Sequence, residues 1–287
     1  MKTNPTFDSY GPALVAAVRE NVRAAIAEDL GSGDLTGLLV PEDKPAQARV
    51  IVRDEAVLCG QPWFDACMHA VDPRLQVRWH QQEGASMEAN SLVCEISGPA
   101  RSLLTAERPS LNFLQLLSGV ATATRHYADL IADTRARVLD TRKTLPGLRL
   151  AQKYAVKMGG GENQRLALYD GILIKENHIA AAGGITAALK AAFAVAAGAT
   201  VQIEVESLEE LEEALAAGAK SVLIDNFTVE MMREAVRINA DRALLEVSGG
   251  VNAETIRGYA ETGVDRISVG ALTKDVRATD YSLRIVG

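Results

Sequence analysis

The sequence predicts an α/β protein in two parts, a mixed α+β part followed by a barrel-like series of βα units. The chain has 287 residues, of which 48% are hydrophobic, enough for one large domain or two modest ones. Strand-like and helix-like segments are mixed irregularly up to residue 133 and alternate regularly after it. In the regular part, nearly every strand-like segment ends in polar residues.

The first part is predicted to combine amphipathic helices with short strands separated by turn residues. The expected helices span residues 12–30, 63–71 and 107–133, the last with a break near Gly119, and the expected strands span residues 48–60, 75–80 and 91–98.

The second part repeats a strand followed by an Ala-rich helix, a pattern that predicts parallel βα units. Strand-like runs begin near residues 137, 170, 200, 221, 244 and 266. Ser207 followed by Glu210 fits a capping box, and Asn252 fits a helix N-cap. Polar residues at the carboxyl ends of the strands favour a barrel-like enzyme, because barrels bind ligands there. An open doubly wound sheet also binds ligands at this end, but it gathers them at one switch point.

Positive charge is concentrated in one stretch of an acidic chain. The net charge is −7, yet residues 141–175 carry seven Lys or Arg and only two acidic residues. The overall charge argues against non-specific binding to nucleic acid or anionic membranes, and the local excess predicts a small anionic ligand. Lys153 and Lys157 are expected on a solvated helix face, and Arg149 is left without a role.

The carboxylates at the strand ends predict a divalent cation. Glu204 and Glu206 lie two residues apart on one strand and share a face, and Asp225 ends the next strand. Mg²⁺ suits this set, because it is bound by few carboxylates together with phosphate oxygens and water. The alternative, which fits Glu206 most readily, is that a carboxylate only pairs with a neighbouring Lys or Arg.

The remaining strand-end residues are suited to anions. Arg142 and Arg165 fit carboxylates, because a guanidinium binds them in bidentate fashion, and Lys143 and Lys175 fit phosphates. The Gly-rich turns at 248–250 and 268–272 predict a phosphate cradle made by backbone N–H groups, although they also fit simple strand-to-helix turns. His178 either supports this site or anchors its loop.

The cysteines and the N-terminus indicate a cytoplasmic protein. Cys59, Cys67 and Cys94 are scattered and form no CxxC pair, so neither a disulfide framework nor a zinc site is expected. Residues 1–10 lack the apolar core of a signal peptide.

Nine motifs resemble one enzyme family, in order along most of the chain. They are EDLGSGDLT (28–36), AERPSLNFLQLLSGVAT (106–122), DTRKTLPGLR (140–149), KYAVKMGGGENQR (153–165), LIKENH (173–178), IEVES (203–207), LIDNF (223–227), EVSGG (246–250) and ISVGALT (267–273). Together they resemble quinolinate phosphoribosyltransferase, the carboxylating nicotinate-nucleotide pyrophosphorylase family of de novo NAD synthesis. The pair DTRKTLPGLR and LIKENH is the most specific.

The resemblance implies an N-terminal α/β sandwich domain (residues 1–120), followed by an open, incomplete α/β barrel (121–273). The C-terminal tail (274–287) would return to the first domain. The resemblance also implies a homodimer in which the N-terminal domain of one subunit covers the barrel mouth of the other. Arg108 would then reach the active site of the partner subunit.

The implied reaction joins quinolinate to phosphoribosyl pyrophosphate, with Mg²⁺, and gives nicotinate mononucleotide, pyrophosphate and CO₂. Each predicted role is carried over to a matching residue of this chain. Arg108, Arg142 and Arg165 would clamp the ring carboxylates, Lys143 and Lys175 would neutralise phosphate charge, and Glu204 and Asp225 would serve the Mg²⁺-associated ribose and its cationic centre. The backbone of Ser248, Gly249 and Gly250, and of Val269, Gly270 and Ala271, would hold the 5′-phosphate, with Thr141 as a lesser candidate.

One position departs from the family. The family usually has Asn-His-Arg where this chain has Asn163, Gln164 and Arg165. The usual histidine helps to line the quinolinate pocket, and Gln164 can donate and accept hydrogen bonds there but cannot carry a charge. We expect activity to survive with a modified acid limb of the pH profile.

Three other interpretations compete with this one. A related barrel protein of molybdenum-transport operons shares the TRKT-PG motif but lacks the context of residues 175–178. A Schiff-base aldolase would use Lys175, although the dense set of anion-binding residues argues against it. A noncatalytic metabolite-binding barrel would be favoured by loss of Lys143, Glu204 or Asp225, and all three are present.

Overall fold

The computed structural model describes residues 11–286, so the expectation about a signal core in residues 1–10 lies outside the described residues. The described chain forms two compact units. The first unit contains residues 11–123, 145–160 and 275–286, and the second contains residues 124–144 and 161–274. The α/β fold class is therefore confirmed, and residues 145–160 lie in the first unit.

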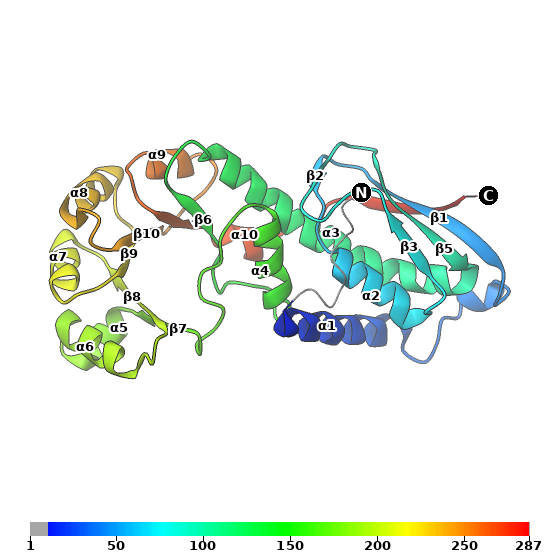
Figure 1. The fold of residues 1–287 in the computed structure, drawn as a ribbon, viewed down its shortest axis with the longest axis horizontal. Coiled ribbons are helices and arrows are strands. Elements are labelled where there is room, and N and C mark those ends of the chain that lie inside the picture. Colours follow the sequence, from blue (N-terminus) through cyan, green and yellow to red (C-terminus); the bar gives the residue numbers. More distant parts are fainter. Residues whose placement is uncertain (1–10, 287) are drawn as a thin grey trace. The chain divides into compact units, whose positions relative to one another are not determined.

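The first unit is built on an antiparallel sheet with the strand order β12-β1-β5-β3. Its elements are the helices α1 (Pro12–Leu30), α2 (Gln61–Val71), α3 (Ala100–Leu130) and α4 (Arg149–Met158), the 3₁₀ helix η2 (Gly37–Leu39), the sheet strands β1 (Pro45–Val52), β3 (Gln76–Trp79), β5 (Leu92–Pro99) and β12 (Tyr281–Val286), and the short pair β2 (Ala56–Val57) and β4 (Ser86–Met87). The expected strand over 48–60 is thus two strands. The C-terminal β12 pairs with β1, so the tail adds a strand to this sheet (Figure 1).

The core of the first unit lies between one sheet face and the helices α2 and α3. Alternate residues of β1 point inward, so Ala48, Val50 and Val52 are fully buried. Phe64 and Met68 of α2 belong to the same buried cluster. Full burial of one such large side chain contributes roughly 1.5–3 kcal/mol, which ties both helices firmly to the sheet.

Helix α3 is continuous, and the break expected near Gly119 is wrong. Gly119 lies inside the helix, and a Cβ atom there would overlap the carbonyl oxygen of Arg277. The glycine therefore permits close approach of the segment that leads to β12. The hydroxyl of Tyr281 on β12 donates to Ser118 Oγ at 2.8 Å, and Ser118 Oγ also accepts the Cys59 N–H at 3.0 Å.

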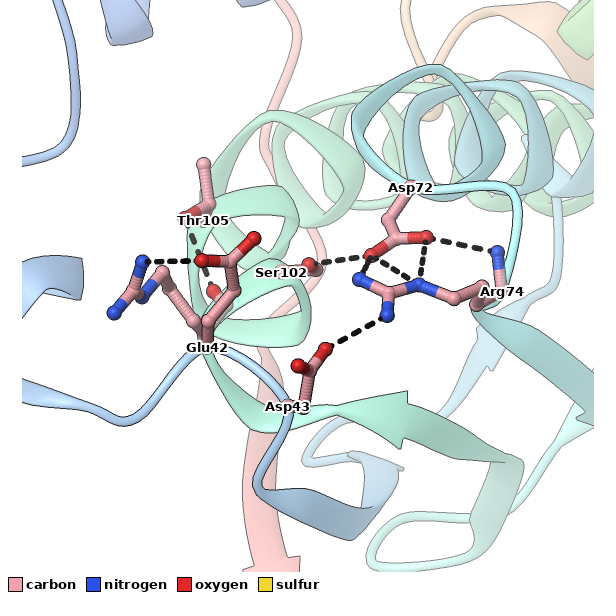
Figure 2. A network of polar contacts seen from close by, with 7 residues as sticks. Glu42, Asp43, Asp72, Arg74, Ser102 and Thr105 are labelled. Carbon is pink, nitrogen blue, oxygen red and sulfur yellow. Dashed lines mark hydrogen bonds and ion pairs between the residues drawn. The ribbon is translucent and has the colours of Figure 1, made fainter.

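A polar network holds the segment before β1 against α2 and α3 in the first unit (Figure 2). The carboxylate of Asp72 accepts hydrogen bonds from the guanidinium of Arg74, at 2.8 Å for Nη2, and from Ser102 Oγ, at 2.7 Å. Arg74 also donates to Asp43 at 2.9 Å. Nearby, Thr105 Oγ1 donates to Asp34 at 2.7 Å. Residues 34–43 are consequently fixed at several points.

The second unit is a six-stranded parallel sheet with the strand order β6-β11-β10-β9-β8-β7. Its strands are β6 (Arg137–Leu139), β7 (Gly171–Ile174), β8 (Thr200–Val205), β9 (Ser221–Asp225), β10 (Leu244–Ser248) and β11 (Arg266–Ser268), and its helices are α5 (Glu176–Ala182), α6 (Ile185–Val195), α7 (Leu208–Ala216), α8 (Val229–Asn239), α9 (Ile256–Ala260) and α10 (Ala271–Lys274). All six strands begin close to the predicted positions. Strands β6 and β7 are the two ends of the sheet, so the barrel is open as expected.

The helices α5 to α8 lie along the outer side of this curved sheet (Figure 1). Caps define where they begin: Ser207 Oγ accepts the N–H of Glu210, and Thr228 Oγ1 accepts the N–H of Met231. Asn252 Oδ1 accepts the N–H groups of Glu254 and Thr255 just before α9. The inner side of the sheet is left for polar side chains that project from the strands.

None of the helices within residues 11–286 combines the length and the hydropathy that a membrane-spanning segment requires. The helices α5 and α6 meet the length and composition criteria only as a pair, which bends by 94°.

Candidate active site

The carboxyl ends of the six parallel strands bring together every predicted site residue that these strands carry. In the order of the strands along the sheet, they are Thr141, Arg142 and Lys143 after β6; Val269, Gly270 and Ala271 after β11; Ser248, Gly249 and Gly250 at β10; Asp225 at β9; Glu204 on β8; and Lys175 after β7. Parallel strands end at one edge, so residues far apart in sequence share one surface. This edge is the candidate active site.

An ion pair joins the ends of the neighbouring strands β7 and β8. The ammonium of Lys175 lies 2.7 and 3.0 Å from the carboxylate oxygens of Glu204, whose side chain is 9% exposed. His178 Nδ1 accepts the backbone N–H of Lys175 at 3.1 Å, so His178 anchors this loop.

Lys143 is positioned by the loop after β6 and by α10. Its backbone N–H donates to Thr141 Oγ1 at 3.1 Å, and its carbonyl accepts from Thr273 Oγ1 at 2.8 Å. A Cβ atom on Gly270 would lie 3.3 Å from Lys143 Cδ. The glycine therefore leaves room for the lysine side chain to cross the turn after β11.

Asn226 connects Asp225 to the glycine turn after β10. Its Nδ2 donates to Asp225 Oδ2 at 2.8 Å, and its own backbone has a φ of 57°. Gly249 has a φ of 98°, and a Cβ atom there would lie 2.5 Å from Asn226 Oδ1. Asn226 is one of the polar residues expected at this strand end, but the sequence predicts no role for it in the site.

The second unit holds Arg142 and Arg165 close enough to affect each other. Burial lowers the pKa of Arg165, and the positive charge of Arg142 lowers it further. Arg165 Nη1 donates to the carbonyl of Gly171 at 3.0 Å. Two arginines that repel one another within a partly buried site favour an anion with more than one carboxylate between them.

Gln164 is held on both its backbone and its side chain. Its N–H donates to Asp140 Oδ1 at 2.9 Å, and the other carboxylate oxygen of Asp140 accepts from Asn163 Nδ2 at 2.6 Å. Its side chain donates from Nε2 to Gln202 Oε1 at 2.7 Å. The amide of Gln164 is therefore fixed at a position where the resemblance implies an imidazole.

The structure corrects the expectation for Lys153 and places two further predicted residues, Glu206 and Arg108. Lys153 on α4 is 3% exposed, so it does not belong to a solvated face, whereas Lys157 is exposed. Glu206 is exposed, and its backbone N–H donates to Glu210. Arg108 lies on α3 in the first unit, with a half-exposed guanidinium 3.9 Å from the Glu107 carboxylate.

The carboxylates of the candidate site are not gathered into one cluster. Among the described residues, no group of three or more His, Cys, Asp or Glu side chains could hold a metal ion. Glu204 pairs with Lys175, so the pairing alternative applies to Glu204. Asp225, which ends β9 beside the glycine turn at 248–250, is the carboxylate that best fits an Mg²⁺ ion carried by phosphates.

Two family models match consecutive parts of the chain. Residues 34–118 match the quinolinate phosphoribosyl transferase N-terminal domain, and residues 120–284 match the C-terminal domain of the same family.

Curated relatives and solved structures agree with these matches. The chain is 41% identical over 277 residues to a nicotinate-nucleotide pyrophosphorylase (carboxylating) of Mycobacterium leprae, a match that covers 93% of this chain and 96% of the relative. It is 38% identical over 259 residues to a probable enzyme of the same name from Bacillus subtilis, covering 90% of each chain. The structure of the nicotinate-nucleotide pyrophosphorylase from Francisella tularensis superposes with a TM-score of 0.92 at 45% identity, covering 94% of this chain and 96% of that one.

Proposed function

The chain belongs to the quinolinate phosphoribosyltransferase family, and on this basis we propose that it joins quinolinate to phosphoribosyl pyrophosphate with loss of CO₂. The products are nicotinate mononucleotide, pyrophosphate and CO₂. The family match confirms the expected class, a phosphoribosyltransferase of NAD biosynthesis. The observation that supports the substrates most directly is the ordered row of cations, carboxylates and glycine turns along one sheet edge.

In the proposed reaction, the pyridine nitrogen of quinolinate attacks the anomeric carbon of the ribose while the bond to pyrophosphate breaks. Arg142 and Arg165 hold the two ring carboxylates, so the nitrogen points toward the ribose. Loss of the 2-carboxylate as CO₂ leaves its electron pair on the ring carbon, which then takes a proton. Because both substrates are multiply charged, positioning and fixed electrostatics supply most of the catalysis.

The other strand ends serve the phosphoribosyl half of the reaction. Lys143 and Lys175 neutralise charge on pyrophosphate and phosphate, and the carboxylates of Glu204 and Asp225 stabilise the positive charge that develops at the anomeric centre. The backbone N–H groups of the turns at 248–250 and 269–271 hold the 5′-phosphate. The ion pair between Lys175 and Glu204 holds the two side chains together at the strand ends.

Mg²⁺ is part of the proposal. The donor set fits an ion held mainly by the pyrophosphate oxygens and water, with Asp225 as its protein ligand. When bound, the ion would neutralise the leaving pyrophosphate. Asn226 holds Asp225 Oδ2 at 2.8 Å and thereby orients the carboxylate.

We also propose a homodimer in which Arg108 serves the site of the partner subunit. Three leucines of residues 35–39 support an association surface on the first unit: Leu35 and Leu39 are each 82% exposed and Leu38 is 67% exposed. Large apolar side chains so close together mark an interaction site. Hydrogen bonds at Asp34 and Asp43 hold the chain on either side of this segment. A cytoplasmic location remains a prediction.

The proposed reaction is tested by mixing the protein with quinolinate, phosphoribosyl pyrophosphate and Mg²⁺. Release of CO₂ from carboxyl-labelled quinolinate and formation of nicotinate mononucleotide are expected in equal amounts. Nicotinate in place of quinolinate is the matched control, because it lacks the carboxylate that is lost. No product with either substrate would contradict the proposal, and product with nicotinate alone would reassign the substrate.

A further inference from the structure

Four polar side chains form a continuous hydrogen-bonded chain beneath the candidate active site. Gln164 Nε2 donates to Gln202 Oε1 at 2.7 Å, and Gln202 Nε2 donates to Glu246 Oε2 at 2.8 Å. Ser268 Oγ donates to the other oxygen, Glu246 Oε1. These four residues, Gln164, Gln202, Glu246 and Ser268, are called the polar floor below.

The polar floor lies directly below the row of predicted site residues. Gln202 precedes Glu204 by two residues on β8, and Glu246 precedes Ser248 by two residues on β10, so each pair shares a face of the sheet. Ser268 ends β11 immediately before the turn at 269–271. Gln202, Glu246 and Ser268 are 6%, 1% and 7% exposed, and buried polar groups of this kind are costly unless they are hydrogen-bonded.

The orientation of each side chain in the polar floor follows from the hydrogen bonds that Glu246 accepts. The two oxygens of Glu246 accept the hydroxyl of Ser268 and the NH₂ group of Gln202. Burial raises the pKa of Glu246, and these two hydrogen bonds act in the opposite direction. The carbonyl oxygen of Gln202 then faces Gln164, and only the NH₂ group of Gln164 can donate a hydrogen bond to it. The carbonyl oxygen of Gln164 is left to accept the backbone N–H of Arg165, at 2.6 Å.

We propose that Gln202 and Glu246 are positioning residues for quinolinate binding, because they fix the amide of Gln164 and, through it, the backbone of Arg165. This inference rests on the proposed function. Neither residue touches substrate: Glu246 orients Gln202, Gln202 orients Gln164, and Gln164 holds the backbone of the arginine expected to clamp a ring carboxylate. Reversal of one amide would place two NH₂ groups or two oxygens face to face and disturb the clamp.

An exchange of acid and amide tests the proposal. In Gln202→Glu, two carboxylates meet in a buried place, and no NH₂ group is left to donate to Glu246. We expect KM for quinolinate to rise about tenfold, the usual cost of a lost hydrogen bond to a buried charged group, while KM for phosphoribosyl pyrophosphate changes little. Gln47→Glu makes the same chemical change at an exposed position of β1 and should leave both constants unchanged.

The double variant Gln202→Glu/Glu246→Gln should restore KM for quinolinate to the wild-type range. The carboxylate introduced at position 202 would then accept from both Gln164 and the new amide at position 246. The oxygen of that amide still accepts from Ser268. All three hydrogen bonds of the polar floor can therefore form, and the buried carboxylate is moved from position 246 to position 202. Thermal stability is measured alongside, because a purely structural role would shift Tm without a selective effect on quinolinate.

The outcomes separate this inference from the proposed function. The positioning role of Gln202 and Glu246 would be overturned if a folded Gln202→Glu protein had the wild-type KM for quinolinate. It would also be overturned if the folded exchange variant kept a raised KM for quinolinate. If the single variant does not fold, the exchange variant alone decides. If the wild-type protein lacks the proposed activity altogether, that proposal fails instead, and quinolinate binding measured by calorimetry in the same variants still tests the polar floor.

Discussion

Gly249 is the residue at which the backbone conformation most directly limits the candidate site. Residues other than glycine rarely adopt a backbone φ of 98°, and Asn226 leaves no room for a Cβ atom at this position. We expect Gly249→Ala to cost about 1–3 kcal/mol in strain and to raise KM for phosphoribosyl pyrophosphate. Gly258→Ala on α9, where a Cβ atom would meet nothing within 4 Å, is the control. An unchanged KM in Gly249→Ala would show that this turn does not hold the phosphate.

Arg142 is the residue on which the quinolinate assignment depends most. Burial, and next the charge of Arg142, lower the pKa of Arg165, so the two guanidinium groups lie close to one another. Arg142→Ala should weaken quinolinate binding by roughly 10- to 100-fold, the range for loss of a charge-assisted, bidentate hydrogen bond. Calorimetry with quinolinate measures this, with Lys157→Ala, an exposed lysine of α4, as the control. Equal affinities would mean that the carboxylate clamp lies elsewhere.

Gln164 is a neutral residue at a position where the resemblance implies a histidine of the proposed quinolinate pocket. Restoring histidine in Gln164→His introduces a group with an ordinary pKa near 6.5, so the acid limb of kcat/KM should change. The alkaline limb, set by other groups, should stay. A profile of kcat/KM against pH measures both limbs, and identical curves for the two proteins would contradict the prediction.

Among the secondary-structure elements, α2, α3 and the segment before β1 are linked by the Asp72 network (Figure 2). Hydrogen bonds from Arg74, and next from Ser102, hold the pKa of Asp72 below its ordinary value of 3.8. The folded state therefore binds this proton less readily than the unfolded chain does. The ionised carboxylate therefore stabilises the fold at any pH above the ordinary pKa of Asp72. This stabilisation is lost as the pH falls through the lowered pKa of the folded state.

Asp72→Asn tests this dependence. At pH 7 the variant should unfold at a temperature a few degrees lower, because the neutral amide accepts weaker hydrogen bonds from Arg74. The difference in Tm between wild type and variant should shrink as the pH falls below about 4. Asp29→Asn, at an exposed position of α1, should leave Tm unchanged at every pH. A pH-independent difference would show that packing, not charge, is responsible.

For the molecule as a whole, the proposed homodimer makes a quantitative prediction. Arg108→Ala and Arg142→Ala should each be nearly inactive alone, but a mixed dimer would contain one complete site, built from Arg142 of one subunit and Arg108 of the other. Random mixing after co-refolding should restore roughly a quarter of wild-type activity, because half of the dimers are mixed and half of their sites are intact. No recovery, with dimers present by light scattering, would place Arg108 in its own subunit's site or outside any site.

The fold class, the six parallel strands and the row of strand-end residues could all be predicted from the amino-acid sequence alone. Hydrophobic periodicity and helix caps are local signals, and parallel strands necessarily bring their carboxyl ends to one edge. Motifs that run along most of the chain also identified the family, which the comparisons confirm. The roles of the individual site residues remain predictions.

Only the tertiary structure shows which residues each of these side chains contacts. The pairing of Glu204 with Lys175, the burial of Lys153 and the continuity of α3 past Gly119 each depend on a segment distant in sequence. The same holds for the polar floor, in which Gln164, Gln202, Glu246 and Ser268 come from four separate segments. Such contacts leave no periodic trace in the chain, because they arise where separate strands and loops fold against one another.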